Sequence, residues 1–305
     1  MMWKSLFFLL SFLSETLFAT TEYMDVSARD EDYTIAYEIF YPDIGDNFPV
    51  IIHIHGSNRD GRKLSDGVAK TDEMGKRLII EGNKLGYAVI PVDIFYSTDL
   101  EPSDKGRFPP AGKFVKKIKT RLSKNEKLDK SRFFLTGFSY GGGQAMKFVS
   151  PEMNYPEGYA WSAIGSAAPG CSKVLEPTKV DYPILMIKGE LDHYPFRACE
   201  WYRDELVKLG NSIELKVIEK VNHFFSTPEG YSPNTPAMNG CTDNPVITYL
   251  NGDRIHVDGT VTSRKKMNRD CFTIGQVNSG KTDRLKLNEV INLILSFFEK
   301  VRSQS

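Results

Sequence analysis

Apolar and polar positions alternate along the chain in a way that predicts strands and helices in turn from about residue 33 onward. Short apolar runs indicate strands, and apolar residues at steps of three and four indicate helices. The predicted strands cover residues 33–41, 50–54, 87–92, 132–136, 159–164, 184–187 and 213–218. The predicted helices cover residues 72–85, 112–122, 141–149, 196–209 and 287–298. Because helices separate most of the strands, this order predicts an α/β protein with a mostly parallel sheet covered by helices on both faces.

One long segment, residues 232–283, interrupts this alternation. It is rich in Asn, Asp, Gly, Thr and Pro, and only a brief piece near residues 246–250 has the apolar character of a strand. A structureless connection of this length is uncommon inside a compact domain. We therefore expect an excursion on the surface, after which the last helix returns to the core.

The N-terminus has the layout of a secretory signal peptide. Lys4 precedes an apolar stretch at residues 6–13, and Ala19 offers a small residue for cleavage before Thr20. The stretch is shorter than the roughly 20 residues that a membrane-spanning helix needs. We therefore expect residues 1–19 to be removed from an exported protein, periplasmic or extracellular, without a membrane span in the mature chain. The alternative is a buried N-terminal helix.

Composition narrows the class of function. The chain has 305 residues, enough for one large domain or two small ones, with 39 basic and 39 acidic side chains and a formal net charge of zero. This balance argues against a broadly basic surface that binds nucleic acid. Only a local basic patch is compatible with it. The oligomeric state does not follow from these numbers.

Four cysteines gain meaning from the predicted export. Cys171, Cys199, Cys241 and Cys271 form an even set, as expected of disulfides in an oxidising compartment. Four cysteines allow three pairings, and the sequence does not choose among them. We prefer Cys241 with Cys271 and Cys171 with Cys199. Four free buried thiols are the alternative; a zinc site is disfavoured because the chain has no C-x-x-C pair.

The strongest chemical signal is the pentapeptide Gly137-Phe138-Ser139-Tyr140-Gly141, which matches G-x-S-x-G. An apolar run precedes it and a helical pattern follows. In that setting the glycines permit a sharp strand-to-helix turn that exposes the serine hydroxyl as a nucleophile. The alternative is a serine in a tight glycine-rich turn without a chemical role.

An acid and a base follow the serine in the order that such a fold requires. Asp192 comes after the strand at residues 184–187, and His223 comes after the strand at residues 213–218. The carboxyl ends of parallel strands converge on one edge of a sheet. We therefore expect His223 to take the proton of Ser139 and Asp192 to orient His223. Glu190 is the rival acid and His193 the rival base.

A turn after the strand at residues 50–54 supplies candidate donors for an oxyanion. The backbone N–H groups of Ser57 and Tyr140 can point at the same place and stabilise the negative oxygen of a tetrahedral intermediate. His53 and His55 alternate on this strand as two metal ligands could. Because no third ligand is evident, we expect them to pack or to stabilise the turn, and we expect no metal.

Taken together, these motifs resemble the α/β-hydrolase superfamily and, within it, the dienelactone hydrolase family. The matching segments are Tyr41-Pro42, Ile54-His55-Gly56, Gly137-Phe138-Ser139-Tyr140-Gly141-Gly142, Gly189-Glu190-Leu191-Asp192 and His223-Phe224. The family's namesakes use a cysteine nucleophile where this chain has Ser139, so lactone specificity does not carry over. The resemblance covers residues 33–225 and the final helix, and it implies a serine esterase-type hydrolase. We therefore expect one α/β-hydrolase domain over residues 20–305, without a cofactor, that hydrolyses a small-molecule carboxylic ester. A peptidase or thioesterase on the same fold is the alternative.

Two rival classes of protein need to be weighed. Residues 275–282 satisfy G-x-x-x-x-G-K-[ST], the phosphate-binding loop of nucleotide hydrolases, and a helix is predicted after them. Too little chain follows for the rest of a nucleotide-binding domain, so we do not favour this interpretation. A hydrolase-like protein that only binds a ligand is the second rival. The complete set of Ser139, Asp192 and His223 argues against it.

Overall fold

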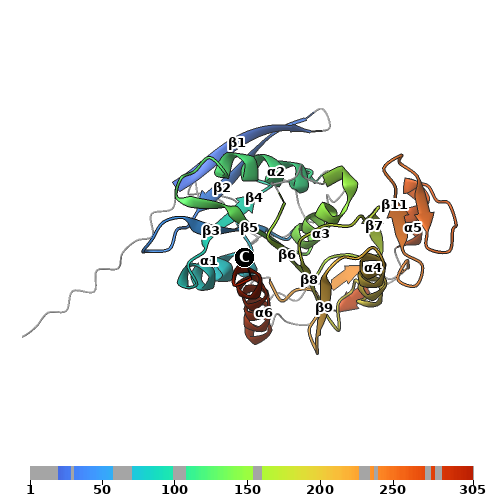
Figure 1. Ribbon diagram of the computed structural model, residues 1–305. Helices are drawn as coiled ribbons and strands as arrows, with labels where there is room; N and C mark the ends of the chain where they lie inside the picture. Colours follow the sequence, from blue (N-terminus) through green and yellow to red (C-terminus); the bar gives the residue numbers. More distant parts are fainter. Residues whose placement is uncertain are drawn as a thin grey trace, which may run out of the picture.

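A computed structural model of the chain contains an eight-stranded sheet as its central element (Figure 1). The structure describes residues 20–28, 31–57, 71–98, 108–153, 160–226, 234–236, 240–271, 276–278 and 284–304. The strands lie in the order β1 (Thr20–Ala28), β2 (Glu31–Ile39), β4 (Ala88–Asp93), β3 (Phe48–Ile54), β5 (Leu128–Phe138), β6 (Ala163–Ala167), β8 (Ile184–Gly189) and β9 (Ile213–Ile218). β1 and β2 are antiparallel to their neighbours, and β4 through β9 in that order are parallel.

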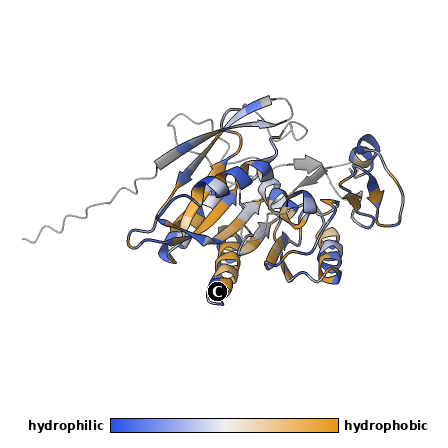
Figure 2. Ribbon diagram, turned by 45° about the horizontal axis from the view of Figure 1, so that its top comes forward, coloured by the Kyte–Doolittle hydropathy of each residue, from blue (hydrophilic) through white to orange (hydrophobic). Residues whose placement is uncertain are grey.

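Helices cover both faces of this sheet, and each face has its own hydrophobic core. α1 (Glu73–Lys84) and α6 (Arg284–Arg302) contribute to one cluster of buried side chains. α2 (Ala111–Leu122), α3 (Tyr140–Met146) and α4 (Arg197–Lys208) contribute to the other. Figure 2 shows apolar strands between these layers. A mostly parallel sheet of this order, covered on both faces, is an α/β-hydrolase fold, as the sequence indicated.

Alternate side chains of β3 belong to the two different hydrophobic cores. Val50, Ile52 and Ile54 belong to the cluster that α2, α3 and α4 cover, whereas Ile51 belongs to the cluster under α1 and α6. All four are fully buried. Successive side chains of a strand point to opposite faces, so a strand covered on both sides becomes a continuous apolar run.

Two strands of the central sheet differ most from the sequence prediction. β1 was not expected; its residues are largely polar, and it pairs only with β2 at the edge of the sheet. The strand predicted at residues 159–164 instead covers Ala163–Ala167. The apolar signal came in part from Trp161, which is buried against the Phe148 ring, with ring centroids 5.3 Å apart, but precedes the strand. An apolar residue such as Trp161 thus indicates that a position is buried, but it does not show that the position pairs in a strand.

The predicted excursion contains more regular structure than its composition indicated. β11 (Val246–Thr248) pairs with β12 (Arg254–His256) and, in parallel, with β7 (Lys173–Leu175), which follows β6 in the chain. Further elements are β10 (Asn234–Pro236), β13 (Gln276–Asn278) and α5 (Arg264–Asp270). In Figure 1, β11 and α5 project from the end of the molecule where α4 lies.

Both disulfides that we preferred are present in the structure. Cys241 and Cys271 join the two ends of the segment that contains β11, β12 and α5. Cys171 and Cys199 join the segment between β6 and β7 to the first turn of α4. No free cysteine is left in the chain.

Two sequence predictions fall on residues whose structure is not described. The signal peptide at residues 1–19 lies wholly outside the described residues. The phosphate-loop match at residues 275–282 lies outside them apart from β13. Among the described helices, none has both the length and the apolar character needed to cross a bilayer.

Candidate active site

Ser139 lies in a strained turn between β5 and α3. Its backbone has φ 52° and ψ −109°, in the left-handed region that side chains disfavour, at a cost of about 1–3 kcal/mol. The turn is also too tight for other side chains: a Cβ at Gly141 would collide with the Ile54 carbonyl, and one at Gly137 would collide with the Gly141 backbone. Both glycines of G-x-S-x-G are thus needed to bring α3 against the sheet.

The base predicted from the sequence lies against this serine. His223 follows β9, and its Nε2 is 2.6 Å from Ser139 Oγ. His223 is 4% exposed, and its imidazole lies against the ring of Phe138, with centroids 5.7 Å apart. The Phe138 ring packs against the imidazole, and the Ser139 hydroxyl lies within hydrogen-bond distance of His223 Nε2.

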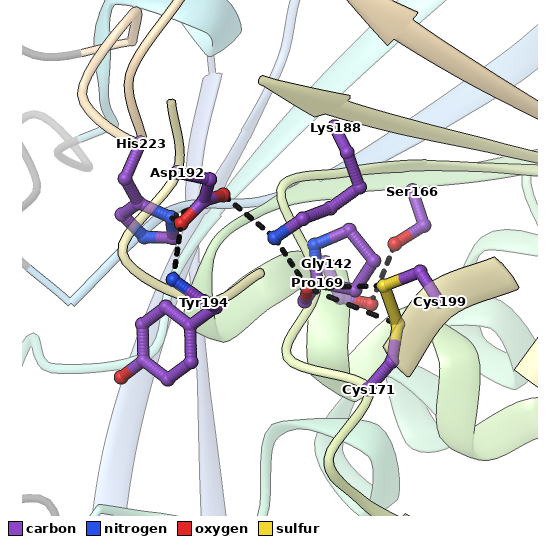
Figure 3. The surroundings of a disulfide bond; sticks show 9 residues. All are labelled: Gly142, Ser166, Pro169, Cys171, Lys188, Asp192, Tyr194, Cys199 and His223. Carbon is purple, nitrogen blue, oxygen red and sulfur yellow. Dashed lines mark hydrogen bonds and ion pairs between the residues drawn. A yellow bond between two sulfur atoms is a disulfide. The ribbon is translucent and has the colours of Figure 1, made fainter. Parts of the chain in front are cut away.

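The predicted acid lies on the other side of the same imidazole. The two oxygens of Asp192, Oδ1 and Oδ2, are 3.0 and 2.9 Å from His223 Nδ1. A carboxylate only accepts, so Nδ1 carries the proton and Nε2 is left to accept from the Ser139 hydroxyl. Tyr194 N donates to Asp192 Oδ1 at 2.8 Å and fixes the orientation of the carboxylate (Figure 3).

Electrostatics keep this carboxylate ionised although it is buried. Burial by itself raises the pKa of Asp192, but the neighbouring His223 and Lys188 more than offset it and hold that pKa well below its ordinary value. Lys188 Nζ donates to Asp192 Oδ2 at 2.6 Å, and both side chains are fully buried. A permanently charged Asp192 favours the single tautomer of His223 that can act as a base.

The rival acid and the rival base occupy other positions. Glu190 accepts a hydrogen bond from Lys220 N at 2.8 Å in an exposed turn. His193 is buried, with its Nδ1 3.7 Å from Asp192 Oδ1 and its ring centroid 4.6 Å from that of His223. The structure brings Asp192 and His223, rather than Glu190 and His193, to Ser139.

Ligand atoms of Asp192, His193 and His223 gather within 4.8 Å of one another, close enough to hold a metal ion. Both ring nitrogens of His223 already face protein groups, Ser139 and Asp192. The Lys188 ammonium also lies 2.6 Å from Asp192 Oδ2 and would repel a cation bound to this carboxylate. The hydrogen bonds therefore favour an acid–base–nucleophile series over a metal site.

The turn after β3 is built around a buried aspartate that the sequence did not single out. Asp72 accepts from Gly56 N at 2.8 Å and lies 2.9 Å from His53 Nε2. His55 Nδ1 is 2.6 Å from the Gly56 carbonyl oxygen, and its Nε2 accepts from Ile94 N at 3.1 Å. His53 and His55 thus pack and stabilise the turn, as we expected, and Asp72 was recognisable only as a residue at a helix start.

The two proposed oxyanion donors come from different elements. Ser57 follows the turn that Asp72 fixes, and Tyr140 begins α3 directly after Ser139. Phe95 and Phe108 pack beside Tyr140, with ring centroids 5.8 and 5.1 Å away, and the Tyr140 hydroxyl donates to the Pro109 carbonyl. The assignment of the Ser57 and Tyr140 N–H groups as oxyanion donors stays a prediction.

Comparison with known proteins finds similarity at the level of three-dimensional structure only. No family model and no curated protein matches the chain. A protein assigned as a dienelactone hydrolase, from Klebsiella pneumoniae, is 14% identical with a TM-score of 0.49, over 68% of this chain and 88% of its own. A butyrate-bound thermophilic esterase from Thermogutta terrifontis is 15% identical with a TM-score of 0.48, over 67% and 85%. An alpha-beta serine hydrolase homologue from Coxiella burnetii is 16% identical with a TM-score of 0.46, over 67% and 89%. The strand order and the turn at Ser139 themselves identify the chain as a protein of α/β-hydrolase fold.

Proposed function

We propose that this protein is an exported serine hydrolase that cleaves carboxylic esters of small molecules through a covalent acyl–Ser139 intermediate. The observation that carries the proposal is the continuous hydrogen-bonded series from Asp192 through His223 to Ser139. An activated nucleophile needs a base within hydrogen-bond reach and a third group that orients the base. Each of these roles has one buried or half-buried side chain at a suitable distance.

The reaction follows from this geometry. Ser139 Oγ attacks the ester carbonyl carbon while its proton passes to His223 Nε2, and the resulting oxyanion accepts from the N–H groups of Ser57 and Tyr140. The intermediate collapses and expels the alcohol, which takes the proton from His223. A water molecule then attacks the acyl–Ser139 ester by the same route, and the carboxylic acid leaves. Asp192 stays ionised throughout and stabilises the imidazolium.

Thioesters and peptides are the alternative substrates because both pass through the same tetrahedral intermediate. We favour the ester over the peptide because an alcohol is a better leaving group than an amine, and His223 would protonate either one. Purified protein assayed against matched ester, thioester and amide forms of one acyl group ranks the three. We expect the ester to have a measurable kcat/KM and the amide to be hydrolysed slowest.

The decisive test of the activity is the Ser139→Ala variant. We expect it to lose hydrolysis of p-nitrophenyl acetate by a factor on the order of 10⁴ or more, with unchanged circular dichroism, because triad members act as a unit. Ser123→Ala removes a hydroxyl from the C-terminal end of α2, where it donates to the Lys119 carbonyl, and serves as the control. Full turnover by Ser139→Ala would contradict the proposal, as would an inactive but folded wild-type protein, which would favour a ligand-binding role.

Export is supported by the disulfides and by the signal-like N-terminus. Two disulfides and no free thiol are typical of proteins that fold in an oxidising compartment. We expect the exported protein to begin near residue 20 and to react with no thiol reagent when denatured without reductant. Four reactive thiols, or an intact N-terminus in the exported fraction, would contradict this part of the proposal.

A further inference from the structure

A buried lysine behind the proposed triad takes no direct part in the reaction described above. Lys188 lies near the end of β8, and its side chain is fully buried. Its ammonium donates to Asp192 Oδ2 at 2.6 Å and to the Pro169 carbonyl at 3.0 Å. Figure 3 shows it on the side of the carboxylate opposite His223. Burying an ammonium is costly, so a lysine here needs a compensating partner.

The second partner of this ammonium, the Pro169 carbonyl, lies in a turn close to a disulfide. Pro169 follows Ala168, a buried residue with φ 50°, and precedes Cys171 by two positions. Cys171 is joined to Cys199 in the first turn of α4, directly after the loop that carries Asp192. The disulfide thus joins the segment whose Pro169 carbonyl accepts from the Lys188 ammonium to the start of α4, which follows the loop that carries Asp192.

We propose that Lys188 is a positioning residue: it orients Asp192 toward His223, and its charge sets the pH above which His223 serves as the base. The inference rests on the proposed function, because it assigns a role within the same triad. Lys188 does not reach Ser139 and acts only through Asp192. Removing it would leave Asp192 without a cation on that side.

The sign of the pH effect follows from the charges. In the described part of the chain, the titratable groups facing Asp192 and His223 are Lys188 on β8, His193 and Tyr194 after β8, and Ser139. Lys188 compensates the negative charge of Asp192. Without it, the uncompensated carboxylate stabilises the positive charge on the imidazolium more strongly. The acidic limb of the kcat/KM profile would then move to higher pH.

The direct test is the Lys188→Met variant, in which a side chain of similar length carries no charge. We expect the midpoint of the acidic limb to move upward by about one pH unit or more, from the Coulomb interaction at an effective dielectric near 20. Lys119→Met is the matched control, because Lys119 is also buried but lies on α2, donating to the Ala160 carbonyl. It should leave the limb in place.

The outcomes separate this inference from the proposed function. An active Lys188→Met enzyme with an unmoved limb would overturn the role of Lys188 and leave the hydrolase intact. Absence of Ser139-dependent hydrolysis in the wild type would overturn both. If Lys188→Met folds but is inactive at every pH, Lys188→Arg decides: restored turnover supports the role of the charge, and continued inactivity overturns it.

A measurement on the wild-type protein covers the case in which Lys188→Met does not fold. The ¹⁵Nζ resonances of lysine side chains report whether each is an ammonium or a neutral amine. We expect Lys188 to be an ammonium at pH 7, with slow hydrogen exchange because of burial and its two acceptors. A neutral amine at pH 7 would overturn the inference, since an uncharged Lys188 cannot compensate Asp192.

Discussion

At the scale of single residues, the site depends on buried charges that have partners. Asp192 faces His223 on one side and Lys188 on the other, and Asp72 faces His53 and two backbone N–H groups, one of them from Gly56. A buried carboxylate is tolerated only with such partners. The same residues therefore govern both the chemistry and part of the stability.

Asp192→Asn tests the first of these carboxylates. We expect kcat/KM to fall by a factor on the order of 10³–10⁴, because an amide no longer favours the tautomer of His223 that accepts from Ser139. The variant also leaves Lys188 without a counter-charge, so the free energy of unfolding should drop by about 3–5 kcal/mol. Steady-state kinetics and urea unfolding measure the two effects. Glu190→Gln is the control. An equal loss of kcat/KM in that variant would indicate that Glu190, rather than Asp192, is the acid of the triad.

Asp72→Asn tests the second carboxylate through pH. Burial raises the pKa of Asp72, but the electrostatic interaction with His53 and the hydrogen bonds with His53, Gly75 and Gly56 leave that pKa below its ordinary value. Its contribution to stability is then complete above pH about 4 and is lost as the pH falls below that. We expect Asp72→Asn to be about 2–3 kcal/mol less stable at pH 7, with the gap narrowing in acid. A gap that does not change with pH would show that the charge of Asp72 contributes nothing.

At the scale of elements, the sequence predicted the turns that carry the chemistry better than the edges of the sheet. The strand–turn–helix at Ser139 was predictable because the glycines and the apolar run are local signals. β1 was missed because an edge strand with solvent on one side has few apolar residues. β6 was placed too early because Trp161 is buried without belonging to a strand.

The excursion is an element whose contribution can be separated from the site. Its segment with β11, β12 and α5 is closed by Cys241–Cys271, which are 30 positions apart. A disulfide closing a loop of this length stabilises by about 3–4 kcal/mol in the chain-entropy account. We expect the Cys241→Ala/Cys271→Ala variant to be cleaved faster by trypsin within residues 240–271 while hydrolysing p-nitrophenyl acetate within about threefold of the wild type. Loss of turnover in a variant whose main sheet stays folded would contradict this prediction and show that the active site depends on the excursion.

At the scale of the whole molecule, three distant loops meet at the carboxyl edge of one parallel sheet. The turn after β5 supplies Ser139, the loop after β8 supplies Asp192, and the loop after β9 supplies His223. Chain order and strand direction were enough to predict this convergence. Lys188 was not predictable, because a lysine at a strand end usually lies in solvent, and only the tertiary packing of Pro169 and Asp192 around it makes it a buried partner.

The most direct test of the central claim is the site of covalent modification. Purified protein is treated with a fluorophosphonate probe, digested and mapped by tandem mass spectrometry, with His223→Ala treated in parallel. We predict a single adduct on the Ser139 hydroxyl in the wild type and labelling slower by two or more orders of magnitude in His223→Ala, because the serine then lacks its base. An adduct on another residue, or equal labelling of Ser139 in both proteins, would contradict the assignment of Ser139 as a nucleophile activated by His223.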